Sequence, residues 1–146
     1  MGLIDHVGPG TVALDASAFI YYVEEHPEYV TILDPLFDEV VRGEREIVTS
    51  GVTLLEVLVV PLRLGNVALA ARYESLLTRG LGVHLVEIDR EQLRMAATLR
   101  ARHNVRTPDA LQLAAALTTG CRAFVTNDNR LRDLPGLRVI QLRDVA

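Results

Sequence analysis

The chain has 146 residues, of which 49% are apolar and 23% charged, and its formal net charge is −4. This length and composition predict one globular domain, residues 1–146, with a full hydrophobic core. The acidic balance argues against nucleic-acid binding by bulk electrostatics. All fifteen basic residues are arginine, and the absence of lysine excludes P-loop, kinase and Schiff-base chemistry.

The sequence shows no targeting or membrane segment. No apolar run approaches the ~20 residues that a membrane helix needs, and the first residues lack the basic start and apolar core of a signal peptide. We therefore expect a cytoplasmic protein with no membrane association. The single Cys121 excludes an intramolecular disulfide and a cysteine-based zinc site, and we expect its thiol to be buried.

Short apolar runs alternate with segments of helical periodicity along the chain. In chain order we expect a strand at 12–14, helices at 17–25 and 28–42, a strand at 47–49, helices at 52–64 and 67–78, a strand at 83–88, helices at 90–103 and 107–119, and strands at 122–126 and 137–142. This alternation predicts an α/β fold with a parallel sheet covered by helices on both faces. The first strand is so short and apolar that we expect it in the centre of the sheet.

The segment 52–64 is apolar nearly all round, interrupted mainly by Glu56 and Arg63. A helix of this kind is buried on more than one side or meets a partner. We predict that it presents an apolar surface used for homodimerisation or for binding a helix of another protein.

Four acidic residues lie where the chain changes direction, and each has a local explanation. Asp15 follows the first strand and suits a helix N-cap. Glu56 stands three residues after Thr53, as in a capping box. Asp109 lies in a first helical turn, where the helix dipole favours an acid. Asp128 suits an Asx turn.

Taken together, the four acids suggest a different purpose. Strand ends and helix starts of an alternating α/β fold meet at one edge of the sheet, where such folds bind ligands. Carboxylates gathered there repel one another unless a cation neutralises them. Oxygen ligands suit Mg²⁺ or Mn²⁺, so the pattern predicts a site for a hard divalent cation.

The ordered set of motifs resembles PIN-domain ribonucleases, specifically VapC-type toxins of toxin–antitoxin pairs. The matching segments extend over nearly the whole chain, at 12–17, 53–59, 107–116 and 123–128. The resemblance implies a three-layer α/β/α sandwich, metal-dependent RNA cleavage, frequent dimerisation, and a small antitoxin that blocks the site.

The resemblance also assigns roles by position. It implies that Asp15, Glu56, Asp109 and Asp128 are the acids of the metal site. We expect Asp15 and Asp109 to hold the ion, with Asp128 on the metal directly or through water. Glu56 is then placed to orient or deprotonate the attacking water. Two small hydroxyl residues accompany the first and last acids in the family, and they correspond to Ser17 and Thr126.

Outside the acids, four side chains are candidate RNA contacts: Arg106, Arg130, Tyr21 and Tyr22. The two arginines flank the third and fourth acids and suit phosphate. Their alternative is a solvent-facing position or a salt bridge to Asp89 or Asp133. For at least one of the tyrosines, aromatic core packing is the expected role.

The sequence argues against two other hydrolase classes. A dehalogenase-type phosphatase needs a second Asp where Ser17 stands, and a serine hydrolase needs a nucleophile elbow that the chain lacks. Two alternatives stay open: a non-catalytic PIN-like partner acting in a protein–DNA repressor complex, and a stand-alone RNA-processing nuclease.

Overall fold

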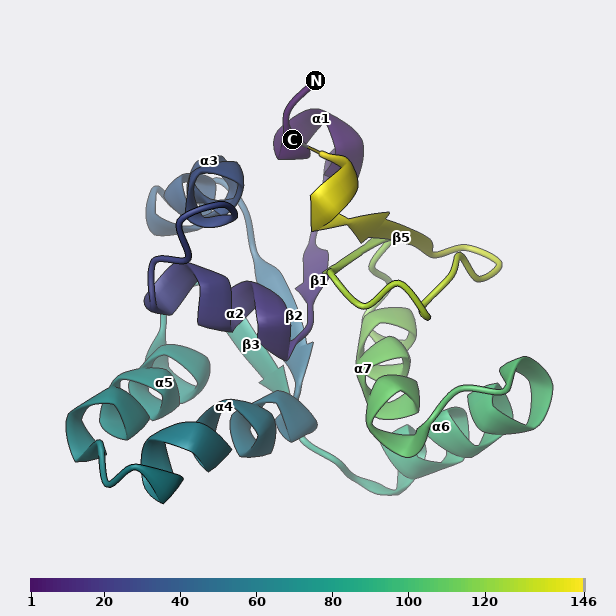
Figure 1. Ribbon diagram of the computed structural model, residues 1–146. Coiled ribbons are helices and arrows are strands. Elements are labelled where there is room, and N and C mark those ends of the chain that lie inside the picture. The colour runs from purple at the N-terminus through teal and green to yellow at the C-terminus, as the bar shows by residue number, and fades with distance from the viewer. Residues whose placement is uncertain (146) are drawn as a thin grey trace.

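A five-stranded parallel sheet forms the centre of the computed structural model, which describes residues 1–145 (Figure 1). The strand order is β3-β2-β1-β4-β5, so the first strand is central, as its short apolar sequence predicts. The strands are β1 (Val12–Leu14), β2 (Ile47–Ser50), β3 (Val83–Val86), β4 (Ala123–Thr126) and β5 (Arg138–Gln141). All five expected strands are present, with ends within two residues of prediction.

Helices connect the strands and cover both faces of the sheet (Figure 1). They are α1 (Leu3–Val7), α2 (Ala16–Val23), α3 (Val30–Val41), α4 (Gly51–Arg63), α5 (Val67–Arg79), α6 (Arg90–His103) and α7 (Thr107–Thr118). Six of them are predicted from periodicity, but α1 is not, because its five residues are too few to show a period. Among the described residues, no helix is long and apolar enough to cross a membrane.

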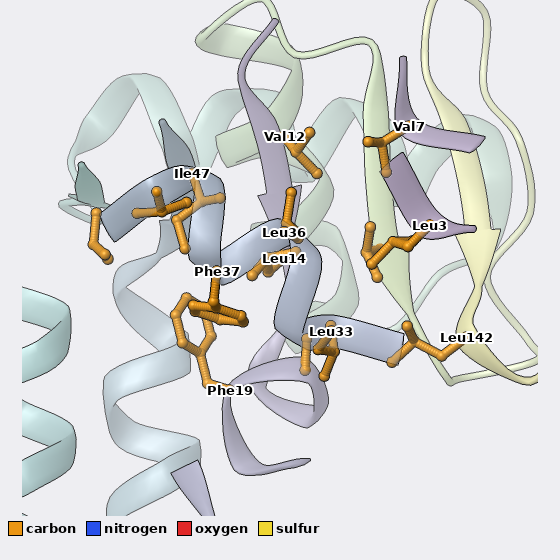
Figure 2. Packing of buried hydrophobic residues seen from close by; sticks show 14 of the residues in the cluster. Leu3, Val7, Val12, Leu14, Phe19, Leu33, Leu36, Phe37, Ile47 and Leu142 are labelled. Atoms are coloured by element: carbon orange, nitrogen blue, oxygen red, sulfur yellow. The ribbon is translucent and has the colours of Figure 1, made fainter. Parts of the chain in front are cut away.

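Two hydrophobic cores lie on opposite faces of the sheet, which confirms the three-layer α/β/α sandwich. The alternation of a strand divides β1 between them: Val12 and Leu14 pack with α1 to α5, whereas Ala13 packs with α6 and α7. Figure 2 shows the first core, where Phe19 of α2 meets Phe37 of α3 edge to face at 6.0 Å.

The α4 helix buries only part of its apolar surface. Thr53, Val57 and Pro61 face the protein. The exposed large apolar side chains of α4, of the turn after it and of the first residue of α5 form what we term the apolar α4 face: Leu55, Val59, Val60, Leu62, Leu64 and Val67. The predicted apolar surface on this helix is therefore present, and its partner stays a prediction.

Matched leucine truncations should separate the buried core from the exposed apolar α4 face. Leu36→Ala should lower the free energy of unfolding by about 2–5 kcal/mol, because Leu36 is completely buried. Leu62→Ala should change it by less than about 0.5 kcal/mol, because Leu62 is 63% exposed. Urea denaturation at low protein concentration measures both. Equal losses would contradict the outward position of Leu62.

Candidate active site

The four predicted acids line one pocket of about 290 Å³ at the carboxyl ends of the central strands. β1 and β4 are adjacent and parallel, with Leu14 opposite Val125, so the residues that follow them emerge side by side. Asp15 follows β1 directly and Asp128 follows β4 after one residue. Glu56 projects from α4 and Asp109 from the first turn of α7.

Three hydrogen bonds from three different residues hold the carboxylate of Asp15. Its Oδ1 accepts from the Ser17 hydroxyl at 2.6 Å and from the Ala18 backbone N–H at 3.3 Å. Its Oδ2 accepts from the hydroxyl of Thr126. Burial raises the pKa of the Asp15 carboxyl, and these hydrogen bonds oppose the rise. The predicted N-cap of α2 is thus present, and the same side chain also faces the pocket.

Glu56 does not belong to a capping box. That expectation is wrong because α4 begins at Gly51 with Ser50 as its N-cap, which leaves Glu56 in the second turn. Its Oε1 instead accepts from Gln112 Nε2 of α7 at 3.2 Å. Partial burial raises the pKa of Glu56, and the nearby Asp15 and Asp109 charges raise it further.

A chain of buried hydrogen bonds behind the pocket fixes Gln112. Its Nε2 also donates to Thr53 Oγ1 at 2.7 Å. Thr53 lies 2.6 Å from Thr49 Oγ1, and the Thr49 hydroxyl donates to the Leu14 carbonyl at 2.7 Å. Since Thr49 has a single hydroxyl hydrogen, Thr53 must donate to Thr49 and accept from Gln112. Sequence reasoning missed Gln112, because nothing local links it to a residue 59 positions earlier.

The other two acids are each paired with an arginine. The Arg130 guanidinium donates two hydrogen bonds to the Asp128 carboxylate, from Nε to Oδ1 at 2.9 Å and from Nη2 to Oδ2 at 2.6 Å. This pairing lowers the pKa of Asp128. Arg106 Nε lies 3.5 Å from Asp109 Oδ2. Both arginines are exposed and line the pocket.

The salt-bridge partners considered from the sequence alone are wrong. Asp89 caps α6 by accepting from the Gln92 N–H at 3.0 Å. Asp133 accepts from the Val139 N–H at 2.7 Å, which secures the turn before β5. Both carboxylates therefore have local structural roles.

The two adjacent tyrosines point in different directions. Tyr22 stacks on Phe37 with ring centroids 3.7 Å apart and a 6° angle between planes, so it belongs to the core. Tyr21 lines the pocket, and its hydroxyl accepts from Asn127 Nδ2 at 3.4 Å. The expectation of core packing for at least one tyrosine is confirmed.

The donor chemistry of the pocket fits a hydrated hard cation. Carboxylate oxygens line it, and Gln112 Oε1 is buried without a hydrogen-bond partner in the described residues. Within residues 1–145, however, no three Asp, Glu, His or Cys side chains are arranged to hold one ion together. Mg²⁺ is usually held by one or two carboxylates and keeps several waters, so this arrangement suits it.

Comparison with known proteins agrees with this geometry. The family model of the PIN domain matches residues 12–137. The chain belongs to the PIN-domain family. A comparison with curated proteins gives no significant match.

Solved structures share the PIN-domain fold at low sequence identity. VapBC2 from Rickettsia felis, bound to a promoter DNA fragment, has a TM-score of 0.63 at 16% identity, covering 90% of this chain and 98% of that one. VapC20 from Mycobacterium tuberculosis, described as a Sarcin-Ricin loop cleaving toxin, has a TM-score of 0.66 at 14% identity, covering 82% and 92%. VapBC-5 from the same organism has a TM-score of 0.59 at 24% identity, covering 91% and 99%.

Removing the Asp15 charge should stabilise the domain. Because burial raises the folded-state pKa of Asp15, the stabilisation linked to its protonation is present below the unfolded pKa and is lost as the pH rises through the folded pKa. In buffer without divalent ions at neutral pH, Asp15→Asn should therefore raise the free energy of unfolding, on the order of 1 kcal/mol. Chemical denaturation across the acid-to-neutral range measures the difference.

The control for that measurement is Asp34→Asn, which removes the same charge from an exposed site on α3. Its stability difference from the wild type should be small. An Asp15→Asn variant less stable than the wild type at neutral pH would show that the lost hydrogen bonds outweigh the removed charge.

Proposed function

We propose that this PIN-domain chain is a Mg²⁺- or Mn²⁺-dependent endoribonuclease acting in the cytoplasm as the toxin of a toxin–antitoxin pair. The observation that carries the proposal is the convergence of four carboxylates, from four separate elements or loops, in one pocket. The family match and the VapC20 and VapBC structures support the nuclease and toxin assignments.

Each side chain then has a defined task. When bound, the divalent ion neutralises the carboxylates, polarises the scissile phosphate and makes water more acidic. Asp15 and Asp109 hold the ion, with Asp128 next to them. Glu56, fixed by Gln112, orients the attacking water and accepts its proton.

Ser17 and Thr126 position the Asp15 carboxylate. Each hydroxyl donates to a different oxygen of Asp15, so the two bonds fix the plane of the carboxylate. Thr126 is completely buried, and its oxygen also accepts from the Asp128 N–H at 3.0 Å. The same hydroxyl therefore connects two of the metal-site acids.

The two arginines connect metal binding to RNA binding. In the free protein Arg130 forms an ion pair with Asp128, and Arg106 forms one with Asp109. A cation at the carboxylates competes with both arginines, and an RNA phosphate offers them an alternative bidentate partner. Metal and RNA should therefore favour each other's binding. The metal ion displaces the arginines from the carboxylates, and the RNA phosphate gives the displaced arginines a new partner.

The apolar α4 face is our candidate surface for protein partners. We propose that the cognate antitoxin or a second copy of the chain covers it, because six large apolar side chains are exposed on α4, the turn that follows and the first residue of α5. The VapBC structures are toxin–antitoxin assemblies, and that of Rickettsia felis is bound to promoter DNA. A catalytic toxin can also take part in such a repressor complex. The alternative function is a chain that acts in the complex without cleaving RNA.

Asp15→Asn should abolish metal-dependent RNA cleavage while keeping the fold. The uncharged amide is a poorer metal ligand, although it still accepts from Ser17 and Ala18. Cleavage of a structured RNA with Mg²⁺ or Mn²⁺ should fall by about a hundred-fold or more. Asp34→Asn, purified identically, should retain wild-type activity. Equal activity of Asp15→Asn and the wild type would refute the assignment, and an inactive wild type that binds no metal would favour the non-catalytic alternative.

Arg130→Gln should have opposite effects on the two ligands. Without RNA, Mn²⁺ should bind about two- to five-fold more tightly, because Asp128 no longer has an arginine partner. RNA should bind more weakly, because one phosphate contact is lost. Calorimetric titration with Mn²⁺ measures the first effect, and fluorescence anisotropy with labelled RNA measures the second. Arg79→Gln, at an exposed position on α5, is the matched control. Unchanged Mn²⁺ affinity would contradict the competition.

A further inference from the structure

Two further cavities continue the carboxylate pocket along one side. The first, of about 70 Å³, shares Arg106, Asp109, Arg130 and Leu131 with the pocket. The second, of about 360 Å³, shares Asn104, Val105 and Arg130 with the first and extends it to His103 and Arg132. Because each cavity shares lining residues with the next, the three lie side by side. We call the part beyond the pocket the arginine groove, and its basic side chains are Arg106, Arg130, Arg132 and His103.

The local backbone brings these basic residues to the pocket. α6 ends at His103, and Asn104 follows in the left-handed conformation with φ of 45°, which turns the chain toward the start of α7. Arg100 fastens this turn by donating to the Val105 carbonyl at 3.1 Å and to Thr107 Oγ1 at 2.9 Å. The basic end of α6 therefore lies beside the helix that carries Asp109.

The charge of the groove contrasts with that of the whole molecule. Residues 1–60 contain two arginines and eleven acids, whereas residues 90–146 contain ten arginines and five acids. Between Glu91 and Asp109 there are four arginines and no acid. The C-terminal part of the chain is therefore basic although the net charge is −4, and three of its segments, α6, α7 and the segment before β5, lie together in Figure 1.

Arg132 is free to bind a ligand. It is exposed, and it makes no ion pair within the part of the chain that the structure describes. The one acid lining the outer cavity, Asp133, has its Oδ1 engaged by the Val139 N–H. Unlike Arg106 and Arg130, Arg132 does not have to leave a carboxylate before it can contact an anion.

An endonuclease cleaves inside a chain, so its substrate must leave the pocket on both sides of the scissile phosphate. The opposite wall carries Tyr21 and Glu56, and beyond Glu56 lies the apolar α4 face. That side offers no arginine to the backbone within the pocket lining. The arginine groove is the side on which phosphates find guanidinium groups, which bind them with two hydrogen bonds.

We infer that the arginine groove binds the phosphate backbone of the RNA strand that continues beyond the scissile phosphate, with Arg132 and His103 at its outer end. This inference rests on the proposed ribonuclease function and adds a direction to it. The strand runs from the carboxylate pocket past Arg106 and Arg130 toward α6. Since backbone contacts carry no base information, the groove supplies affinity and position for any RNA sequence.

The test measures RNA binding in the inactive Asp15→Asn background, so that cleavage does not interfere. Fluorescent RNAs of about four and about fifteen nucleotides are titrated over a series of salt concentrations. Adding Arg132→Gln should weaken binding of the longer RNA about three- to ten-fold and lower its salt dependence by about one counterion. Binding of the short RNA should change little, because it ends before the outer cavity.

The matched control is Arg79→Gln, which removes the same charge from the opposite side of the sheet. It should leave both RNAs unaffected. Equal losses for Arg132→Gln and Arg79→Gln would mean general electrostatics and would overturn the groove. The groove would also be overturned if Arg132→Gln weakened binding of an oligoglutamate probe but not of RNA, because that result would assign this surface to an acidic protein.

The experiments can refute the role of the arginine groove and the ribonuclease function separately. A wild-type protein that cleaves RNA, together with unchanged RNA affinity in Arg132→Gln, would overturn the groove and leave the function in place. A wild-type protein that neither binds nor cleaves RNA would overturn both. Thermal unfolding of each double variant, compared with Asp15→Asn alone, confirms that the fold is intact, as expected because Arg132 and Arg79 are exposed.

Discussion

The carboxylate of Asp15 ties together the end of the central strand, the start of α2 and the end of the neighbouring strand. Three donors hold it: the Ser17 hydroxyl, the Ala18 N–H and the Thr126 hydroxyl. These bonds keep an ionisable group in a place where burial disfavours its charge. The rest of the pocket is arranged around this fixed carboxylate, because β1 and β4 set the positions from which the other side chains approach.

The remaining three acids are held in two different ways. Glu56 is placed from inside, by Gln112 and the buried hydroxyls of Thr53 and Thr49, which connect α7, α4 and β2. Asp109 and Asp128 are held from outside, by exposed arginines that solvent and ligands can reach. The inner half of the site is therefore preorganised, whereas under the proposed function the outer half exchanges partners when a cation or a phosphate arrives. Preorganised polar groups are the ones that stabilise a transition state most effectively.

The sequence predicts the parts of this molecule that depend on periodicity and on strand order. Alternating apolar runs locate the strands and six helices, and the parallel arrangement brings Asp15, Asp109 and Asp128 to one edge. The hydrogen bonds of Gln112 are different, because they join segments more than fifty residues apart, where no period exists to reveal them. The arginine partners are local in sequence: Arg106 and Asp109 have the i,i+3 spacing of one helical turn, and Arg130 is two residues from Asp128.

The separation of charge along the chain has a kinetic consequence. At physiological ionic strength, charges are screened beyond roughly 8 Å, so an approaching polyanion responds to the nearest surface rather than to the net charge. A polyanion is therefore repelled near exposed acids such as Asp34 and Asp38 on α3, and attracted near exposed arginines such as Arg106 and Arg132. Under the proposed function, the orientation of a collision then decides whether it is productive, and a molecule that is acidic overall would still capture RNA through the arginine groove.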